Sequence, residues 1–224
     1  TIATAANMQY AMEALEEAYE QQSGSDIEVI IGSSGKLTAQ IQQGAPFDIF
    51  LSADTKYPEL LYEKKLTEGR PQLYAQGQLV LWTLNENLLL SIEQLQNKSV
   101  SHIAMANPKT APYGRATVEA FDRLGITAEI QEKLVYGESI AQVNQFITTK
   151  AADLGFTSKS SVIANTNGNW ITIPDSLFSP IDQSLVILKN ERGLAEDART
   201  FVEFLNSQKG QEILNKFGYR SKSD

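Results

Sequence analysis

The chain has 224 residues, enough to bury a substantial core as one large domain or as two domains of about 100 residues each. Hydrophobic residues make up 42% and charged residues 21% of the sequence, which excludes a disordered chain. The formal net charge of −8 opposes binding to nucleic acid or anionic membranes. No apolar run approaches the roughly 20 residues that cross a bilayer, and the absence of cysteine excludes disulfides and thiolate metal sites.

Strand and helix patterns alternate along the chain, which predicts an α/β fold with largely parallel sheets. In the first part, the predicted elements are an opening strand, a helix over residues 8–19, a strand over 27–31, a helix from Leu37, a strand over 47–51 and a helix through Leu60 and Leu61. Asp54 follows the third of these strands and is interpreted as the N-cap of the next helix.

The second part continues the same alternation. The predicted strands are 79–83, 102–106, 133–136, 154–157, 170–173 and 185–188. The predicted helices are one whose buried face runs from Thr117 to Leu124, one over residues 140–147, and a terminal amphipathic helix from Phe201 to Phe217. No internal repeat or long linker interrupts this order.

Four turns between a predicted strand and a predicted helix are rich in small residues, namely 5–7, 33–35, 111–114 and 137–140. Backbone N–H groups at a helix N-terminus lack intrahelical partners, and the helix dipole is positive there, so each turn suits an anion. In open α/β sheets, ligands bind beyond the carboxyl ends of the strands. A ligand that takes hydrogen bonds from all four turns would accept bonds and donate none, as a tetrahedral dianion does.

Several longer stretches carry a family resemblance. They are TAAN at residues 4–7, GSSGKLTAQIQQGAPFDIFLSAD at 32–54, NPKTAPYGRAT at 107–117, LGFTSKSSV at 154–162 and GQEILNKFGY at 210–219. The run GAPFDIFLSAD at 44–54 is the most specific of them. With these motifs, the chain resembles the periplasmic molybdate-binding proteins of ABC importers over nearly its whole length.

The resemblance implies a two-lobed fold of the type II periplasmic-binding-protein kind, in which each lobe is a mixed, mostly parallel sheet flanked by helices. Lobe 1 is expected to comprise residues 1–77 and 183–224, and lobe 2 residues 78–182. Two crossovers near 76–78 and 182–184 are expected to form the hinge. Ligand would stabilise the closed form by contacting both lobes.

The resemblance also implies a set of ligand contacts. The residues implied to contact the oxyanion are Ala6, Asn7, Ser34, Tyr113 and Ile140, the last through its backbone N–H. Contact with the metal would run through the oxygens of molybdate and involve no direct coordination. A tyrosine that some members carry is replaced by Ser158, and the Tyr113 hydroxyl or the Asn7 amide is the expected substitute.

The partners and location that the resemblance implies are those of an importer component. No cofactor is expected; molybdate or tungstate is the transported ligand, and the membrane permease of an ABC importer is the partner. The chain is expected to act as a monomer in the periplasm, or as a cell-surface lipoprotein in a Gram-positive organism. No nucleic acid or direct membrane insertion is expected, and a signal peptide is taken to have been removed before Thr1.

Each residue of this set also has a purely structural interpretation. Ser34 and Asn7 are possible N-caps, Tyr113 a turn aromatic, and Ile140 a core residue. Asp48 and Asp54 are interpreted as structural, because a carboxylate that faces a dianion is repelled.

Other functions are less well supported by the residues. A carrier for sulfate, phosphate or chromate is the main alternative, and an enzyme or sensor on the same fold is the second. A serine-histidine-aspartate arrangement has only His102 to draw on, and that residue is expected at the start of a strand. Glu138 is the acidic residue that comes closest to the four turns.

Overall fold

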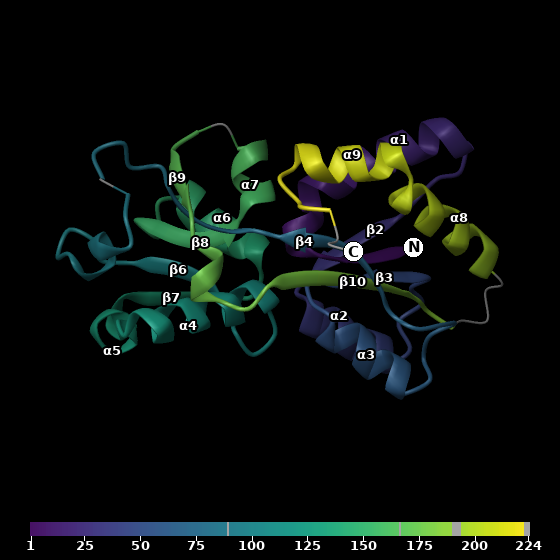
Figure 1. The fold of residues 1–224 in the computed structure, drawn as a ribbon, viewed down its shortest axis with the longest axis horizontal. Helices are drawn as coiled ribbons and strands as arrows, with labels where there is room; N and C mark the ends of the chain where they lie inside the picture. The colour runs from purple at the N-terminus through teal and green to yellow at the C-terminus, as the bar shows by residue number, and fades with distance from the viewer. Residues whose placement is uncertain (89, 166, 190–193, 222–224) are drawn as a thin grey trace. The chain divides into compact units, whose positions relative to one another are not determined.

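The computed structural model describes residues 1–88, 90–165, 167–189 and 194–221. The chain divides into two compact units: unit 1 is Thr1–Gly77 with Asp182–Asp224, and unit 2 is Gln78–Ile181. Each unit is built on one five-stranded sheet with helices packed against it (Figure 1). That the two connections between the units act as a hinge stays a prediction.

The sheet of unit 1 has the strand order β2-β1-β3-β10-β4. The strands are β1 (Ile2–Ala5), β2 (Val29–Gly32), β3 (Ile49–Leu51), β4 (Gln72–Gly77) and β10 (Ile181–Ile187). The helices of this unit are η1 (Ala6–Met8, a 3-10 helix), α1 (Gln9–Ser23), α2 (Ser34–Gln42), α3 (Lys56–Glu63), α8 (Ala195–Asn206) and α9 (Gln208–Lys216). Strand β1 pairs in parallel with β2 and β3, whereas β10 is antiparallel to β3.

Alternating side chains of the strands divide the core of unit 1 into two layers. Ile2 and Leu51 face one layer, where they pack with residues of α1, α8 and α9; Ala3 faces the other, with residues of α2 and α3 (Figure 1). In the first layer, the ring of Tyr19 lies 5.3 Å from that of Phe201. The two layers hold the sheet between helices on both faces.

Unit 2 repeats this plan with the strand order β7-β6-β8-β5-β9. The strands are β5 (Leu79–Thr83), β6 (Ile103–Ala106), β7 (Leu134–Gly137), β8 (Leu154–Ser158) and β9 (Asn169–Thr172). The helices are η2 (Glu93–Gln96), α4 (Pro112–Leu124), α5 (Thr127–Ile130), η3 (Gln131–Lys133), α6 (Ile140–Thr148), α7 (Lys159–Ala164) and η4 (Asp175–Leu177). Strand β6 pairs in parallel with β7 and β8, and β5 is antiparallel to β8 and β9.

The mixed sheets flanked by helices confirm the predicted fold class, and several details correct the prediction. Strand β4 is absent from the predicted elements, and β10 begins four residues before the predicted strand 185–188. The predicted terminal helix is two helices, because Ser207 has extended backbone angles (φ −68°, ψ 164°). The Ser207 side chain accepts a bond from Gly210 N and caps α9. Among the described residues, no helix is both long and apolar enough to span a bilayer.

The N-terminal turn of α4 lies unusually close to the backbone that follows β6. A Cβ atom on Gly114 would stand 2.2 Å from the carbonyl oxygen of Ala106 and 2.9 Å from Pro108 N. Both neighbours are backbone atoms, so a rotamer change cannot relieve the overlap. Glycine at this position is therefore required for the start of α4 to reach its place beside the sheet.

We predict that Gly114→Ala lowers the free energy of unfolding by about 1–3 kcal/mol, because the added methyl group displaces the first turn of α4. Urea denaturation followed by circular dichroism measures this change. Gly69→Ala is the matched control, since a Cβ there meets nothing within 4 Å and the residue is not in the left-handed region. Equal denaturation midpoints for the two variants would contradict the close approach.

Candidate oxyanion-binding site

Two of the small-residue turns start side by side at one edge of the unit 1 sheet. Strands β1 and β2 are parallel neighbours, and Ala5 is in register with Gly32. The chain passes from Ala5 directly into η1, and from Gly32 through Ser33 into α2. The first turns of both helices therefore lie beyond the carboxyl ends of adjacent strands, as expected for a ligand site in an α/β sheet.

Ser34 is the first residue of α2 and is fully buried. Its Oγ accepts a hydrogen bond from the backbone N–H of Ala53 at 3.0 Å. The interpretation of Ser34 as a helix cap is wrong, because Ser33 occupies the N-cap position and makes no side-chain cap bond. The bond from Ala53 uses a lone pair of Ser34 Oγ, so the hydroxyl hydrogen is left to be donated to another acceptor.

Ser33 is a feature of this turn that the sequence reasoning did not single out. Its side chain is 3% exposed, and its Oγ has no hydrogen-bond partner among the described residues. A buried hydroxyl without a partner is costly, and such an atom in a native structure calls for an explanation. The doubled serine at 33–34 was the only sequence signal for it.

Asn7 lies within η1, and its side chain faces the interior of unit 1. Its Nδ2 donates to Gln183 Oε1 at 3.0 Å and to the hydroxyl of Tyr219 at 2.9 Å. The N-cap position of η1 is Ala5, so the N-cap interpretation of Asn7 is wrong. Both hydrogens of the amide are engaged, and a ligand contact at Asn7 would use the backbone N–H. Ala6 is buried beside it at the start of η1.

The other two turns occupy the corresponding edge of the unit 2 sheet. Strands β6 and β7 are parallel neighbours with Ala106 in register with Gly137. Helix α4 begins with Pro112, which has no N–H, so Tyr113 supplies the first backbone N–H of that helix. Ile140 is the first residue of α6, and its side chain is buried, which leaves the backbone N–H as its means of contact with an anion.

Ser158, which stands where some relatives are expected to carry a tyrosine, has a structural role here. It is the N-cap of α7, and its Oγ accepts from Ser161 N at 3.3 Å. The Ser158 and Ser161 hydroxyls are also 2.8 Å apart and share a hydrogen bond. Ser158 therefore stabilises the N-terminus of α7.

The helices that begin at the four turns, together with α1, which directly follows η1, differ from the other helices in the side chains at their N-termini. Helices η1, α1, α2, α4 and α6 have neither a side-chain cap bond nor an acidic residue in the first turn. Every other helix among the described residues has one or the other. An acidic first-turn residue occurs in α3, α5, α8, η2, η3 and η4. Serine side chains cap α7 and α9.

This division by position has a simple electrostatic meaning. An acid in the first turn stabilises a helix by about 0.3–1 kcal/mol, and a side-chain cap by about 1 kcal/mol. The helices at the four turns forgo both. Their positive N-termini therefore have neither a capping side chain nor a first-turn carboxylate.

The acidic residues that the sequence places near these turns have other partners. Asp48 Oδ2 lies 2.6 Å from the Thr1 ammonium group. Asp54 Oδ1 accepts from Ser52 Oγ at 2.9 Å and from Tyr57 N at 3.3 Å, near the start of α3, which begins two residues later than Asp54. Both aspartates have structural contacts, but the interpretation of Asp54 as the N-cap of the next helix is wrong, because Thr55 occupies that position of α3.

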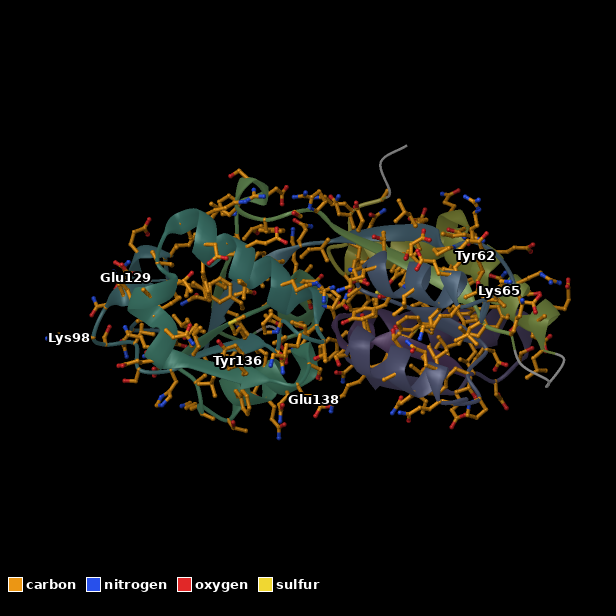
Figure 2. The ribbon with its side chains drawn as sticks, turned by 90° about the horizontal axis from the view of Figure 1, so that it is seen from below. Tyr62, Lys65, Lys98, Glu129, Tyr136 and Glu138 are labelled. Atoms are coloured by element: carbon orange, nitrogen blue, oxygen red, sulfur yellow. The ribbon has the colours of Figure 1, made fainter. Side chains whose placement is uncertain are left out.

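Of the residues considered for catalysis, Glu138 lies in the turn that precedes α6, and His102 directly precedes β6. Glu138 is exposed, and Figure 2 shows it with the exposed Tyr136 at the surface of unit 2. His102 is exposed as well, and its backbone N–H donates to Asp153 Oδ2 at 2.9 Å. Among the described residues, no group of three or more histidine or acidic side chains is placed to hold a metal ion.

Comparison with known proteins shows the family to which this chain belongs. The family model of the bacterial extracellular solute-binding proteins matches residues 1–220. The molybdate-binding protein ModA of Rhodobacter capsulatus is 36% identical over 97% of this chain and 86% of its own length. The ModA protein of Azotobacter vinelandii is 37% identical over 97% of this chain and 88% of its own length.

A solved structure agrees with the sequence relatives. The periplasmic molybdate-binding protein of Azotobacter vinelandii superposes with a TM-score of 0.93 at 33% identity, and the match covers 99% of both chains. The family match, the relatives and the shared fold all extend over nearly the whole chain. This chain belongs to the bacterial extracellular solute-binding proteins.

Proposed function

We propose that this protein captures molybdate, and tungstate as well, as a bare dianion and delivers it to an ABC importer. The observation that carries the proposal is the distribution of helix caps. The helices without caps or first-turn acids are the four that start at the four turns and α1, which directly follows η1. All the other helices of the described part of the chain have a side-chain cap or a first-turn acid. The ModA relatives give the identity of the anion that these N-termini suit.

The donors that we assign to the oxyanion are mainly backbone groups. They are the N–H groups at Ala6, Asn7, Ser34, Tyr113 and Ile140, together with the Ser34 hydroxyl. In this proposal, four of the six donors belong to unit 1 and two to unit 2, so ligand favours the conformation in which both units contact the same ion. The metal is held through its oxygens, without direct coordination.

Hydrogen-bond chemistry gives such a site its affinity and selectivity. About six charge-assisted bonds, each of roughly 1.5–3 kcal/mol, exceed the association cost of about 4–15 kcal/mol when the donors are pre-positioned. Phosphate keeps a proton at neutral pH, and that proton would face a donor in a site without acceptors. Sulfate is smaller than molybdate, so its hydrogen bonds would be longer and weaker.

The remaining parts of the proposal follow from the family. Solute-binding proteins of this family are extracellular, and we assign this chain to the periplasm or the cell surface. Its partner is the membrane permease of an ABC importer, to which a monomer of the loaded protein binds. It acts by binding and release, without chemical turnover of the ligand.

Calorimetric titration of the purified protein with molybdate, with and without saturating sulfate, tests the function directly. We expect one molybdate per chain with a dissociation constant in the micromolar to nanomolar range, and no displacement by sulfate. Heat with sulfate but none with molybdate would keep the oxyanion site and change its ligand. No heat with either anion would refute the proposal.

Ser34→Ala removes the one side-chain hydroxyl assigned to the ion while leaving the backbone N–H in place. We predict that the dissociation constant for molybdate rises more than tenfold, which corresponds to the loss of one charge-assisted hydrogen bond. Ser207→Ala is the matched control: it removes the cap of α9, so it lowers stability by about 1 kcal/mol and leaves affinity unchanged. Equal affinities of the two variants would show that Ser34 has no direct role.

A carboxylate built into the first turn of α2 would compete with the ligand for the positive helix end. We predict that Gly35→Asp weakens molybdate binding at least a hundredfold, because the two negative charges repel each other at close range. Gly35→Asn has nearly the same shape without the charge and is expected to bind within tenfold of the parent. Isothermal titration of both variants measures the difference, and similar losses in the two would indicate a steric effect only.

A further inference from the structure

A buried polar network in unit 1 surrounds the side chain of Asn7. Its four members are Asn7, Tyr74, Gln183 and Tyr219, and none of them is more than 4% exposed. They come from η1, β4, β10 and the segment after α9. Polar groups at such depth are costly unless they are paired, so the network has to be satisfied wherever it persists.

Tyr219 bonds to Asn7 at two points. Its hydroxyl donates to the backbone carbonyl oxygen of Asn7 at 2.7 Å and accepts from Asn7 Nδ2 at 2.9 Å. One hydroxyl thus holds the main chain and the side chain of the same residue. We call this pair of bonds the Asn7 clasp. A phenylalanine ring would fill the same volume without either bond.

Gln183 provides the second anchor of the network. Its Oε1 accepts from Asn7 Nδ2 at 3.0 Å and from the Tyr74 hydroxyl at 2.9 Å. Burial raises the pKa of Tyr74 well above its usual value, so its hydroxyl stays protonated and remains a donor. The amide plane of Asn7 is therefore fixed from β10 as well as from Tyr219.

The backbone around Tyr219 is itself attached to the sheet. Gln76 N donates to Arg220 O at 2.9 Å, and Arg220 N donates to Gln76 O at 3.0 Å. Tyr219 N also donates to Leu214 O at 3.1 Å. These bonds leave the Tyr219 hydroxyl little freedom, and a fixed hydroxyl in turn leaves the backbone of η1 little freedom.

We infer that Tyr219 is a positioning residue for oxyanion binding, which acts by holding the backbone donors of Ala6 and Asn7 in place through the Asn7 clasp. The inference rests on the proposed function. Backbone donors that must meet a ligand oxygen within a few tenths of an ångström lose affinity when their support loosens. The Tyr219 ring need not touch the ligand for this to hold.

The test compares Tyr219→Phe with Tyr19→Phe by molybdate calorimetry and urea denaturation. Tyr19 is the matched control because it belongs to the same apolar cluster, and its ring packs against Phe201 and Phe204. We expect Tyr219→Phe to raise the dissociation constant about tenfold and Tyr19→Phe to change it less than threefold. Equal effects of the two variants on affinity would overturn the inference.

A double-variant cycle separates positioning from general destabilisation. Asn7→Ala removes the amide side of the clasp but keeps the carbonyl to which Tyr219 donates, so Tyr219→Phe is expected to weaken binding by a smaller factor in its presence than in the parent. Tyr19→Phe is expected to leave the effect of Asn7→Ala unchanged. Independent, multiplicative losses for Asn7 and Tyr219 would overturn the inference. If Tyr219→Phe does not fold, Gln183→Met withdraws the other acceptor of the Asn7 amide and is expected to weaken binding at least threefold; unchanged affinity would count against the network.

The parent protein distinguishes this inference from the function on which it rests. If the parent fails to bind molybdate, the proposed function fails, and the positioning role that rests on it fails too. If the parent binds and Tyr219→Phe binds equally well, the function stands and only the positioning role is lost.

Discussion

The structure depends on one constraint. The helices η1, α2, α4 and α6 begin beyond the carboxyl ends of strands without a side-chain cap or an acidic residue in the first turn. Parallel pairing brings the carboxyl ends of β1 and β2 together in unit 1 and those of β6 and β7 together in unit 2. Small residues at the turns allow close approach, and Gly114 is the sharpest case. Serine caps and acidic first-turn residues are common at the other described helices. The helices at the two edges therefore differ from them in having no negative or capping side chain at the N-terminus.

The absence of caps and first-turn acids at these helices lowers the stability of the fold, and the surrounding structure offsets this loss. Unit 1 places its sheet between two apolar layers, and the buried network around Asn7 pairs the Asn7 amide with Gln183 and Tyr219, while Gln183 Nε2 has no hydrogen-bond partner among the described residues. The site is therefore built on rigid elements, with strands and a fixed C-terminal segment behind it. Because the proposed donors are mainly backbone groups, their placement depends on packing more than on the identity of the side chain at each position.

Much of this could be predicted from the sequence, because the relevant signals are local. The alternation of strands and helices, the small-residue turns and the specific run at 44–54 are all short-range patterns, and they gave the fold class. The errors have a different origin. Ser34 was read as a possible cap because a pattern cannot tell which of two adjacent serines is the first helical residue. The pairing of β4 and the bonds of Asn7 to Gln183 and Tyr219 join residues far apart in the chain, and no local pattern reports them.

The separation within the Asn7 clasp bears on how the protein folds. Asn7 and Tyr219 are 212 positions apart, so the start of η1 cannot reach its final arrangement until nearly the whole chain has emerged and α9 has packed. Contacts at such range close large loops and form late in folding. In a chain that has not been completed, the turn at residues 5–7 would lack the hydrogen bonds from Tyr219. The protein would then become able to bind its proposed ligand only late in folding, after each sheet has assembled.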